Sequence, residues 1–194
     1  MKVLFVVLLI SLTFYSLGQN RHHVDETNYY DKPKVLVLLL NSTNEPVTGV
    51  VHKKYSNGQL SWETTYIDGT RNGLMRVWHS NGQLKHEENW ISGEKEGVSR
   101  GWYRNGQLES DLNYKNDDRD GLCRYWHENG KKMLEYSVKK GSRHGLYREW
   151  YQNGQIMLEV VFKKGAEHGL EKFWHSNGEL GWERRKKRGK LINE

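Results

Sequence analysis

Histidine and acidic side chains are the groups in this sequence whose types could bind a metal or act in catalysis. The pair His22-His23, followed by Asp25 and Glu26, could hold a metal ion weakly. We favour the alternative, a short histidine cluster without a ligand role. The sequence has no Ser/His/Asp spacing, no Gly-rich loop ending in Lys-Ser/Thr and no His-Glu-x-x-His motif. We therefore predict that the protein is not an enzyme and has no catalytic residues, metal site or cofactor.

Tryptophan side chains are candidates for recognition of a partner. Five of them recur every 24 residues, at Trp78, Trp102, Trp126, Trp150 and Trp174. An exposed row of indoles could hold a sugar, a lipid headgroup or a peptide, whereas a buried row would pack neighbouring elements together. We expect packing to dominate, with the arginine two residues before the indole, such as Arg148 before Trp150, stacked over it. Packing and binding of a protein partner are compatible if one edge of the row stays exposed.

A basic run near the end of the sequence is a candidate for contact with anions. Its cations are Arg184, Arg185, Lys186, Lys187, Arg188 and Lys190. The chain carries a net charge of +6, and residues 19–194 carry +5 because Lys2 is the one charged residue before them. Without the six cations of the run, residues 19–194 would carry a net charge of −1. Nucleic-acid-binding proteins usually spread their basic surface along a face, so we disfavour that role. We expect the run to prevent an exposed sheet edge from pairing with strands of other chains. Binding to an anionic surface such as lipid is the alternative.

The elements that position these side chains are internal repeats of 24 residues. Asn-Gly occurs at residues 57–58, 81–82, 105–106, 129–130, 153–154 and 177–178, and a second glycine series starts at Gly49 with the same spacing. A further glycine series begins at Gly69, with Asp117 in its one gap. Six repeats follow, at residues 49–72, 73–96, 97–120, 121–144, 145–168 and 169–192.

Each repeat has the pattern of a β-hairpin. Asn-Gly between alternating apolar residues predicts a two-residue type I′ turn, in which both residues have positive φ. If the first Gly is position 1, this turn places position 4 opposite 15, 6 opposite 13 and 8 opposite 11. Basic residues at position 4 then face acids at position 15, in the pairs Arg76–Glu87, Arg100–Asp111, Arg124–Glu135, Arg148–Glu159 and Lys172–Glu183. Such pairs stabilise a sheet by about 0.2–1 kcal/mol each.

The expected fold is all-β, an elongated and twisted antiparallel array of six 24-residue β-hairpin repeats. Positions 2, 4, 6, 13, 15 and 17 share one face, and the other face is richer in Leu, Tyr, Phe and Val. In such an array, His79, His127 and His175 stand about 19 Å apart, too far to share a metal ion. We expect them to fill space in a half-buried row, alternating with Tyr.

The residues before the repeats differ in composition from the rest of the chain. Lys2 precedes an uninterrupted apolar run, and Ser16-Leu17-Gly18 ends the segment, as in a secretory signal peptide over residues 1–18. An uncleaved membrane anchor is the alternative. Residues 19–48 are expected to form an N-terminal segment with a capping strand or a degenerate repeat. A mean hydropathy of −0.89 excludes a multi-spanning membrane protein, and the single cysteine, Cys123, excludes a disulfide framework.

The repeat resembles the bacterial variant of the MORN repeat. Its clearest copies are Trp78-His79-Ser80-Asn81-Gly82-Gln83-Leu84 and Trp150-Tyr151-Gln152-Asn153-Gly154-Gln155-Ile156. The resemblance covers all six repeats and implies a β-hairpin array, protein scaffolding and contact with phospholipid. Many bacterial members are described as antitoxins, whereas the secretion signal of this chain favours an envelope scaffold or protection against an exported toxin.

We therefore expect an exported, non-enzymatic scaffold that binds a protein partner, antitoxin- or immunity-like in type. It would work in the periplasm, in the cell envelope or outside the cell. The alternative is a peripheral membrane module that binds anionic lipid through the basic C-terminal strand.

Overall fold

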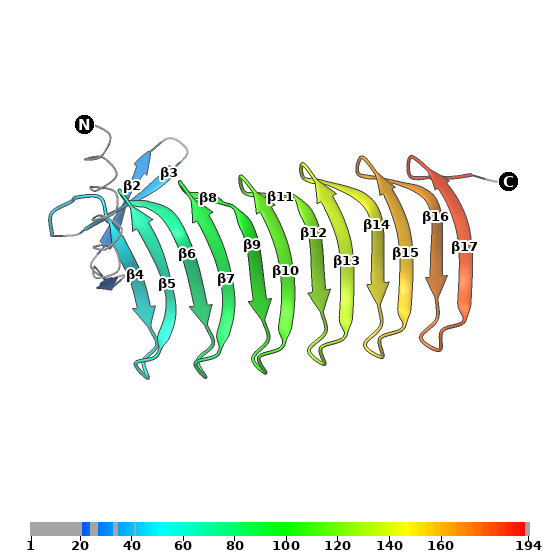
Figure 1. Ribbon diagram of the computed structural model, residues 1–194, viewed down its shortest axis with the longest axis horizontal. Coiled ribbons are helices and arrows are strands. Elements are labelled where there is room, and N and C mark those ends of the chain that lie inside the picture. The colour runs from blue at the N-terminus through cyan, green and yellow to red at the C-terminus, as the bar shows by residue number, and fades with distance from the viewer. Residues whose placement is uncertain (1–20, 24–26, 33–34, 41, 193–194) are drawn as a thin grey trace, which may run out of the picture. The chain divides into compact units, whose positions relative to one another are not determined.

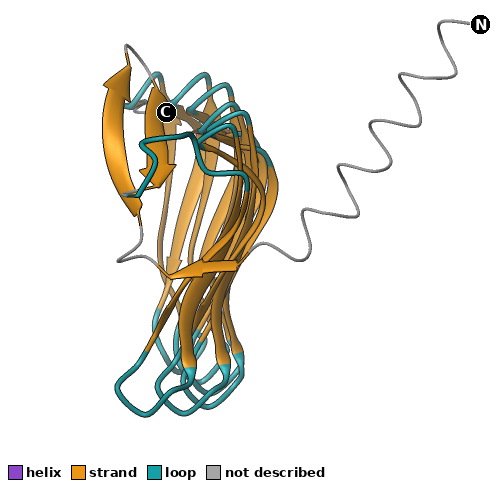
Figure 2. Ribbon diagram, turned by 90° about the vertical axis from the view of Figure 1, so that its left-hand side faces the viewer, coloured by secondary structure: helices purple, strands orange, loops and turns teal. Residues whose placement is uncertain are grey.

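The computed structural model describes residues 21–23, 27–32, 35–40 and 42–192. These residues form strands and turns and no helix, so none of them belongs to a helix that could cross a membrane (Figure 2). The predicted all-β fold of antiparallel hairpins is confirmed. The predicted signal peptide lies outside the described residues. Two compact units, residues 1–94 and 95–194, are described separately below.

The first unit contains a four-stranded antiparallel run and additional strands before it. Its strands are β1 (Arg21–His23), β2 (Thr27–Lys32), β3 (Val35–Leu40), β4 (Gly49–Lys54), β5 (Leu60–Ile67), β6 (Thr70–Trp78) and β7 (Leu84–Ile91). Strands β4 to β7 pair in sequence order (Figure 1). In the N-terminal segment, β1 pairs in parallel with β4, and β2 pairs with β3 in a separate two-stranded sheet.

The second unit continues the same alternation of strands. Its long strands are β9 (Gly97–Trp102), β10 (Leu108–Lys115), β12 (Gly121–Trp126), β13 (Lys132–Lys139), β14 (Ser142–Trp150), β15 (Ile156–Lys163), β16 (Ala166–Trp174) and β17 (Leu180–Lys187). The short strands of this unit are β11 (Asp118–Arg119) and β18 (Lys190–Leu191), and β8 (Glu94–Lys95) spans the last residue of the first unit and the first residue of the second. Each long strand from β9 to β17 pairs with the next in antiparallel orientation.

The Asn-Gly turns differ from the predicted type. In the second repeat, the N–H of Gly82 donates to the carbonyl of His79 at 2.9 Å, and the N–H of His79 donates to the carbonyl of Gln83 at 2.8 Å. Gly82 has a φ of 85°, whereas Asn81 is not among the residues with positive φ. The loop is therefore a three-residue connection with a left-handed glycine, and the prediction of a two-residue type I′ turn was wrong.

The extra loop residue shifts the strand register beside the turn. Position 6 pairs with position 12 instead of position 13, as in Trp78 opposite Leu84. The shift occurs after position 5, so position 4 still lies opposite position 15, as in Arg76 opposite Glu87. The predicted charge pairing survives because it lies beyond the irregularity.

Two-residue turns occur at the opposite ends of the strands. Asp68-Gly69 joins β5 to β6 with φ values of 48° and 74°, and Ile67 pairs directly with Thr70. In the third repeat the same turn is Asn116-Asp117, with φ values of 50° and 66°. Asn and Asp tolerate left-handed backbone better than most residues, which explains why Asp117 can replace the glycine.

The core lies on the face that carries positions 3, 16 and 18. In the second unit its buried members are Leu112, Cys123, Tyr136, Val138, Tyr147 and Val160, and in the first unit they are Val47, Val51 and Tyr66. The predicted apolar face is thus the buried one. Burial raises the pKa of the Cys123 thiol, which makes it a packing residue rather than a reactive one.

Candidate binding surface

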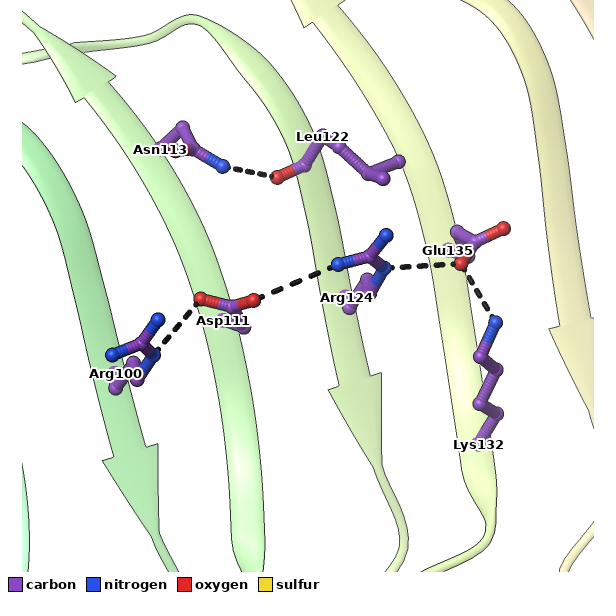
Figure 3. A network of polar contacts seen from close by, with 7 residues as sticks. All are labelled: Arg100, Asp111, Asn113, Leu122, Arg124, Lys132 and Glu135. Carbon is purple, nitrogen blue, oxygen red and sulfur yellow. Dashed lines mark hydrogen bonds and ion pairs between the residues drawn. The ribbon is translucent and has the colours of Figure 1, made fainter.

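A row of alternating charges crosses the strands on the face opposite the core. In the second unit, Asp111 accepts from Arg100 at 3.3 Å and pairs with Arg124 at 3.7 Å; Arg124 in turn bonds Glu135 at 3.2 Å (Figure 3). Lys132 adds a bond of 2.8 Å to Glu135. Hydrogen bonds from Lys132 and Arg124 hold the pKa of Glu135 below its usual value against its partial burial.

The five predicted charge pairs within hairpins are confirmed. The remaining three join Arg76 to Glu87, Arg148 to Glu159 and Lys172 to Glu183, each at 2.8 Å. The sequence analysis missed the pairs between hairpins, such as Arg124 with Asp111 and Arg76 with Glu63. They arise because the two-residue turns also bring position 15 of one repeat opposite position 4 of the next.

Position 7 links successive hairpins within a unit. The hydroxyl of Tyr103 donates to the carbonyl of Trp126 at 2.6 Å, and Tyr151 does the same to Trp174 at 2.9 Å. His127 replaces the tyrosine in the repeat between them, with its Nε2 at 3.0 Å from the carbonyl of Trp150. Because a carbonyl only accepts, this His nitrogen donates. The alternation of Tyr and His therefore preserves a hydrogen bond, a role beyond the space filling that we predicted.

The turn asparagines form a second set of links between hairpins. The Oδ1 of Asn129 accepts from the N–H of Lys131 at 3.0 Å, which braces the turn from within. Its Nδ2 donates to the carbonyl of Gln152 in the next turn at 2.8 Å. Asn57, Asn105 and Asn153 make the equivalent bonds to the following turn. The asparagine thus fixes both the local turn and the spacing between turns within a unit.

The five tryptophans predicted as partner-binding candidates occupy equivalent, half-buried places. They are Trp78 in the first unit and Trp102, Trp126, Trp150 and Trp174 in the second. Over Trp150 the cation is Lys132, 5.4 Å from the ring centre, and not the basic residue of its own strand. Arg148 pairs instead with Glu159.

A groove of about 430 Å³ opens beside Trp150, near the Asn-Gly turns of the fourth and fifth repeats. Its lining comprises His127, Met133, Leu134, Glu149, Trp150, Tyr151, Gln152 and Met157. Both methionines occupy position 13, the residue left without a partner by the register shift. The sequence analysis overlooked these methionines because it placed position 13 in a regular pair opposite the tryptophan. Only one of the five tryptophans lines this groove.

The basic run divides into two groups in the last hairpin. Arg184 and Lys186 bond the buried carboxylate of Glu171, with Lys186 also bonded to Glu167. Burial alone would raise the pKa of Glu171, but these hydrogen bonds outweigh it and hold the pKa below its usual value. The remaining cations, Arg185, Lys187, Arg188 and Lys190, are exposed. The run thus caps the end of the core and also presents charge to solvent.

The residues that suggested metal chemistry are not gathered into a site. Throughout the described ranges, no group of three or more His, Cys, Asp or Glu side chains has the geometry to hold a metal ion. Asp25 and Glu26, the proposed partners of His22-His23, lie outside those ranges.

Comparison with known proteins gives a family likeness over the middle of the chain. No curated protein matches the sequence. MORN repeats are in general non-enzymatic modules that bind proteins or lipids. The MORN repeat variant matches four segments of this chain, residues 71–91, 95–116, 119–140 and 143–164. Over these four segments, then, the hairpins of this chain are similar to those of the MORN repeat variant.

Proposed function

We propose that the protein is an exported, non-enzymatic repeat scaffold that binds a protein partner. The groove beside Trp150 carries this proposal, because its lining combines Trp150 and Tyr151 with two methionines and a leucine. Tryptophan and tyrosine are the residues that most often dominate binding energy at protein interfaces. Methionine is flexible and polarizable, so it adapts to partner side chains. The occupant that fits is an apolar side chain of a partner protein.

Polar contacts hold the walls of this groove in place. His127 bonds the carbonyl of Trp150 at 3.0 Å, which joins one wall to the next hairpin. Glu149 accepts a hydrogen bond from the hydroxyl of Tyr147, which fixes its carboxylate. Burial is the main cause of the raised pKa of Tyr147, with the bond to Glu149 adding to it. A groove whose walls are fixed before binding loses less conformational entropy when a partner enters.

The finer part of the proposal concerns the partner and the compartment. The partner would be a toxin-like protein that the scaffold neutralises, in an antitoxin- or immunity-like role. The support for this role is the resemblance of the repeats to the MORN repeat variant, many bacterial members of which are described as antitoxins. The signal-peptide pattern of residues 1–18 supports export to the periplasm, the cell envelope or the medium.

The test is capture of a partner by the tagged full chain, compared with variants of two tryptophans at the same repeat position. Trp150→Ala removes a wall of the groove, whereas Trp102→Ala removes an equivalent indole that does not line it. We expect one protein, captured near 1:1 and retained at high salt, to be lost with Trp150→Ala and kept with Trp102→Ala. Equal capture by the two variants, or recovery of no protein at all, would contradict the proposal.

A second candidate function is peripheral attachment to an anionic membrane. The observation in its favour is the exposure of Arg185 and Lys190 in the last hairpin. Attraction between exposed charges is screened beyond about 8–10 Å at physiological salt. Sedimentation with phosphatidylserine vesicles should therefore collapse in 0.5 M salt, taken as roughly three times physiological ionic strength, and in the variant Arg185→Gln/Lys190→Gln. Salt-resistant sedimentation would argue against this candidate.

A further inference from the structure

A second cavity, of about 450 Å³, lies at the two-residue turns of the last two repeats, away from the Trp150 groove. Its lining is Lys163, Lys164, Ala166, His168, Lys187 and Arg188. Four of these six residues are cationic, and none of the lining residues is an acid. Lys163, Lys164, Lys187 and Arg188 are exposed, and their charges share one hollow, so they attract an anion that enters it.

The backbone holds these cations close together. Lys164 and Arg188 are the first residues of successive two-residue turns, and each has a left-handed φ of 53°. The N–H of Gly189 in the second turn donates to the carbonyl of Glu167 beside the first, at 2.9 Å. This bond ties the two turns to one another, so Lys164 and Arg188 stand in neighbouring turns.

Two carboxylates in the same pair of repeats are engaged on the other face of the sheet. Glu167 and Glu171 both bind Lys186, and Glu171 also binds Arg184. Successive side chains of a strand point to opposite faces, so Lys186 and Lys187 lie on different sides of β17. Lys186 therefore pairs with Glu167 and Glu171, whereas Lys187 adds its positive charge to the cavity, whose lining contains no acidic residue.

We propose that this cavity binds a compact phosphate-bearing anion. Its volume lies within the range of small-molecule sites, about 300–1,000 Å³. Lysine ammonium groups are common phosphate ligands and arginine offers a bidentate fork to phosphate oxygens. His168 supplies a further ring nitrogen to the same space. The ligand is a phosphate monoester or diphosphate group, carried by a free small molecule or by a lipid headgroup.

The site is distinct from the basic run in the sequence. Only Lys187 and Arg188 belong to that run, and the other polar lining residues come from the preceding repeat. A sequence signal for the site does exist: positions 19 and 20 of the fourth, fifth and sixth repeats are Lys139-Lys140, Lys163-Lys164 and Lys187-Arg188. The inference does not depend on the protein-binding role proposed above.

The test is calorimetric titration of the full chain with inorganic pyrophosphate at physiological ionic strength. The variant Lys164→Gln/Arg188→Gln removes two charges from the cavity. The matched control, Lys139→Gln/Lys140→Gln, removes two charges from an equivalent turn outside the lining. We expect the cavity variant to bind at least tenfold more weakly and the control to stay within twofold of the parent chain. Unchanged thermal unfolding of both variants checks that the fold is intact.

A second arm distinguishes the source of the phosphate. The same three proteins are sedimented with vesicles of phosphatidylcholine, alone or with phosphatidylinositol 4-phosphate. Pyrophosphate binding that is lost in the cavity variant supports the site for a free ligand. Vesicle binding that requires the phosphorylated lipid and is lost in the same variant supports the site for a headgroup. Equal weakening in the cavity variant and the control, or no binding of either probe, would overturn the proposal.

Discussion

Replacement of Asn129 by Asp isolates the hydrogen bond that joins two neighbouring turns. The Oδ1 of Asn129 accepts from the N–H of Lys131, and its Nδ2 donates to the carbonyl of Gln152. Aspartate has the same shape and keeps an acceptor for Lys131, but it has no N–H to donate. Asn129→Asp therefore leaves the internal brace of the turn and removes the link to the next hairpin. Asn129→Ala removes both.

The expected cost follows from the number of bonds lost. A net hydrogen bond contributes about 0.5–1.5 kcal/mol, and the turn is exposed, which favours the lower half of that range. A carboxylate facing the carbonyl of Gln152 adds some repulsion. We expect Asn129→Asp to lower the free energy of unfolding by about 1 kcal/mol and Asn129→Ala by about 2 kcal/mol.

The control is the asparagine of the last repeat, whose side-chain bonds stay within its own turn. The Nδ2 of Asn177 donates to Glu179 within its own turn at 2.8 Å. In a Glu179→Gln background, where no like charge faces the new carboxylate and the Gln amide can donate to it, Asn177→Asp should cost less than about 0.5 kcal/mol.

Urea denaturation measures the free energies of these variants, and amide hydrogen exchange reports on the turn itself. The Lys131 amide should stay protected in Asn129→Asp and lose protection in Asn129→Ala. The reasoning would be refuted if Asn129→Asp were as stable as the parent chain, or if Asn177→Asp cost as much.

Three further predictions concern other rows of the repeats. Gly121→Ala should lower the melting temperature more than Gly145→Ala: both have left-handed φ, at 113° and 80°, but only at Gly121 would a Cβ meet a neighbouring side chain, the Cβ of Asn113 at 3.2 Å. Because the pKa of Glu171 is lowered in the folded state, its contribution to stability should be complete above its unfolded value of about 4.3 and vanish as the pH falls through the folded value. Urea midpoints of the parent chain and Glu171→Gln should therefore converge in acid, and a constant difference would contradict this. A double-mutant cycle of Arg124→Ala and Glu135→Ala should give a coupling of about 0.5 kcal/mol, because both side chains are partly exposed; zero coupling would remove the charge row as a stabilising feature.

Local patterns made most of the fold predictable. The spacing of Asn-Gly and of the charged residues defines the hairpins, because a cross-strand pair such as Arg76 with Glu87 lies only 11 residues apart in the chain. The turn type was harder to predict, since Asn-Gly suits both a two-residue turn and a three-residue loop that ends in a left-handed glycine. The extra residue in the loop places position 12, and not position 13, opposite each tryptophan, as in Trp78 opposite Leu84.

Contacts between repeats were the part that the sequence analysis missed. The side chains of Asn129 and His127 donate to backbone carbonyls of the next repeat. Every residue type has such a carbonyl, so the acceptor cannot be recognised from the sequence. The Trp150 groove depends on Met133 and Met157, whose position 13 becomes irregular only through the register shift. The tryptophan row was visible in the sequence, but the groove beside Trp150 was not.

Affinity for the captured partner tests the central claim, that the Trp150 groove is the protein-binding surface, most directly. Isothermal titration of that partner into the full chain, into Trp150→Ala/Met157→Ala and into Trp102→Ala gives stoichiometry and Kd together. The account predicts 1:1 binding, a Kd at least tenfold weaker for the groove variant, and little change for Trp102→Ala or in high salt. An unchanged Kd for the groove variant, or binding abolished by salt alone, would contradict it.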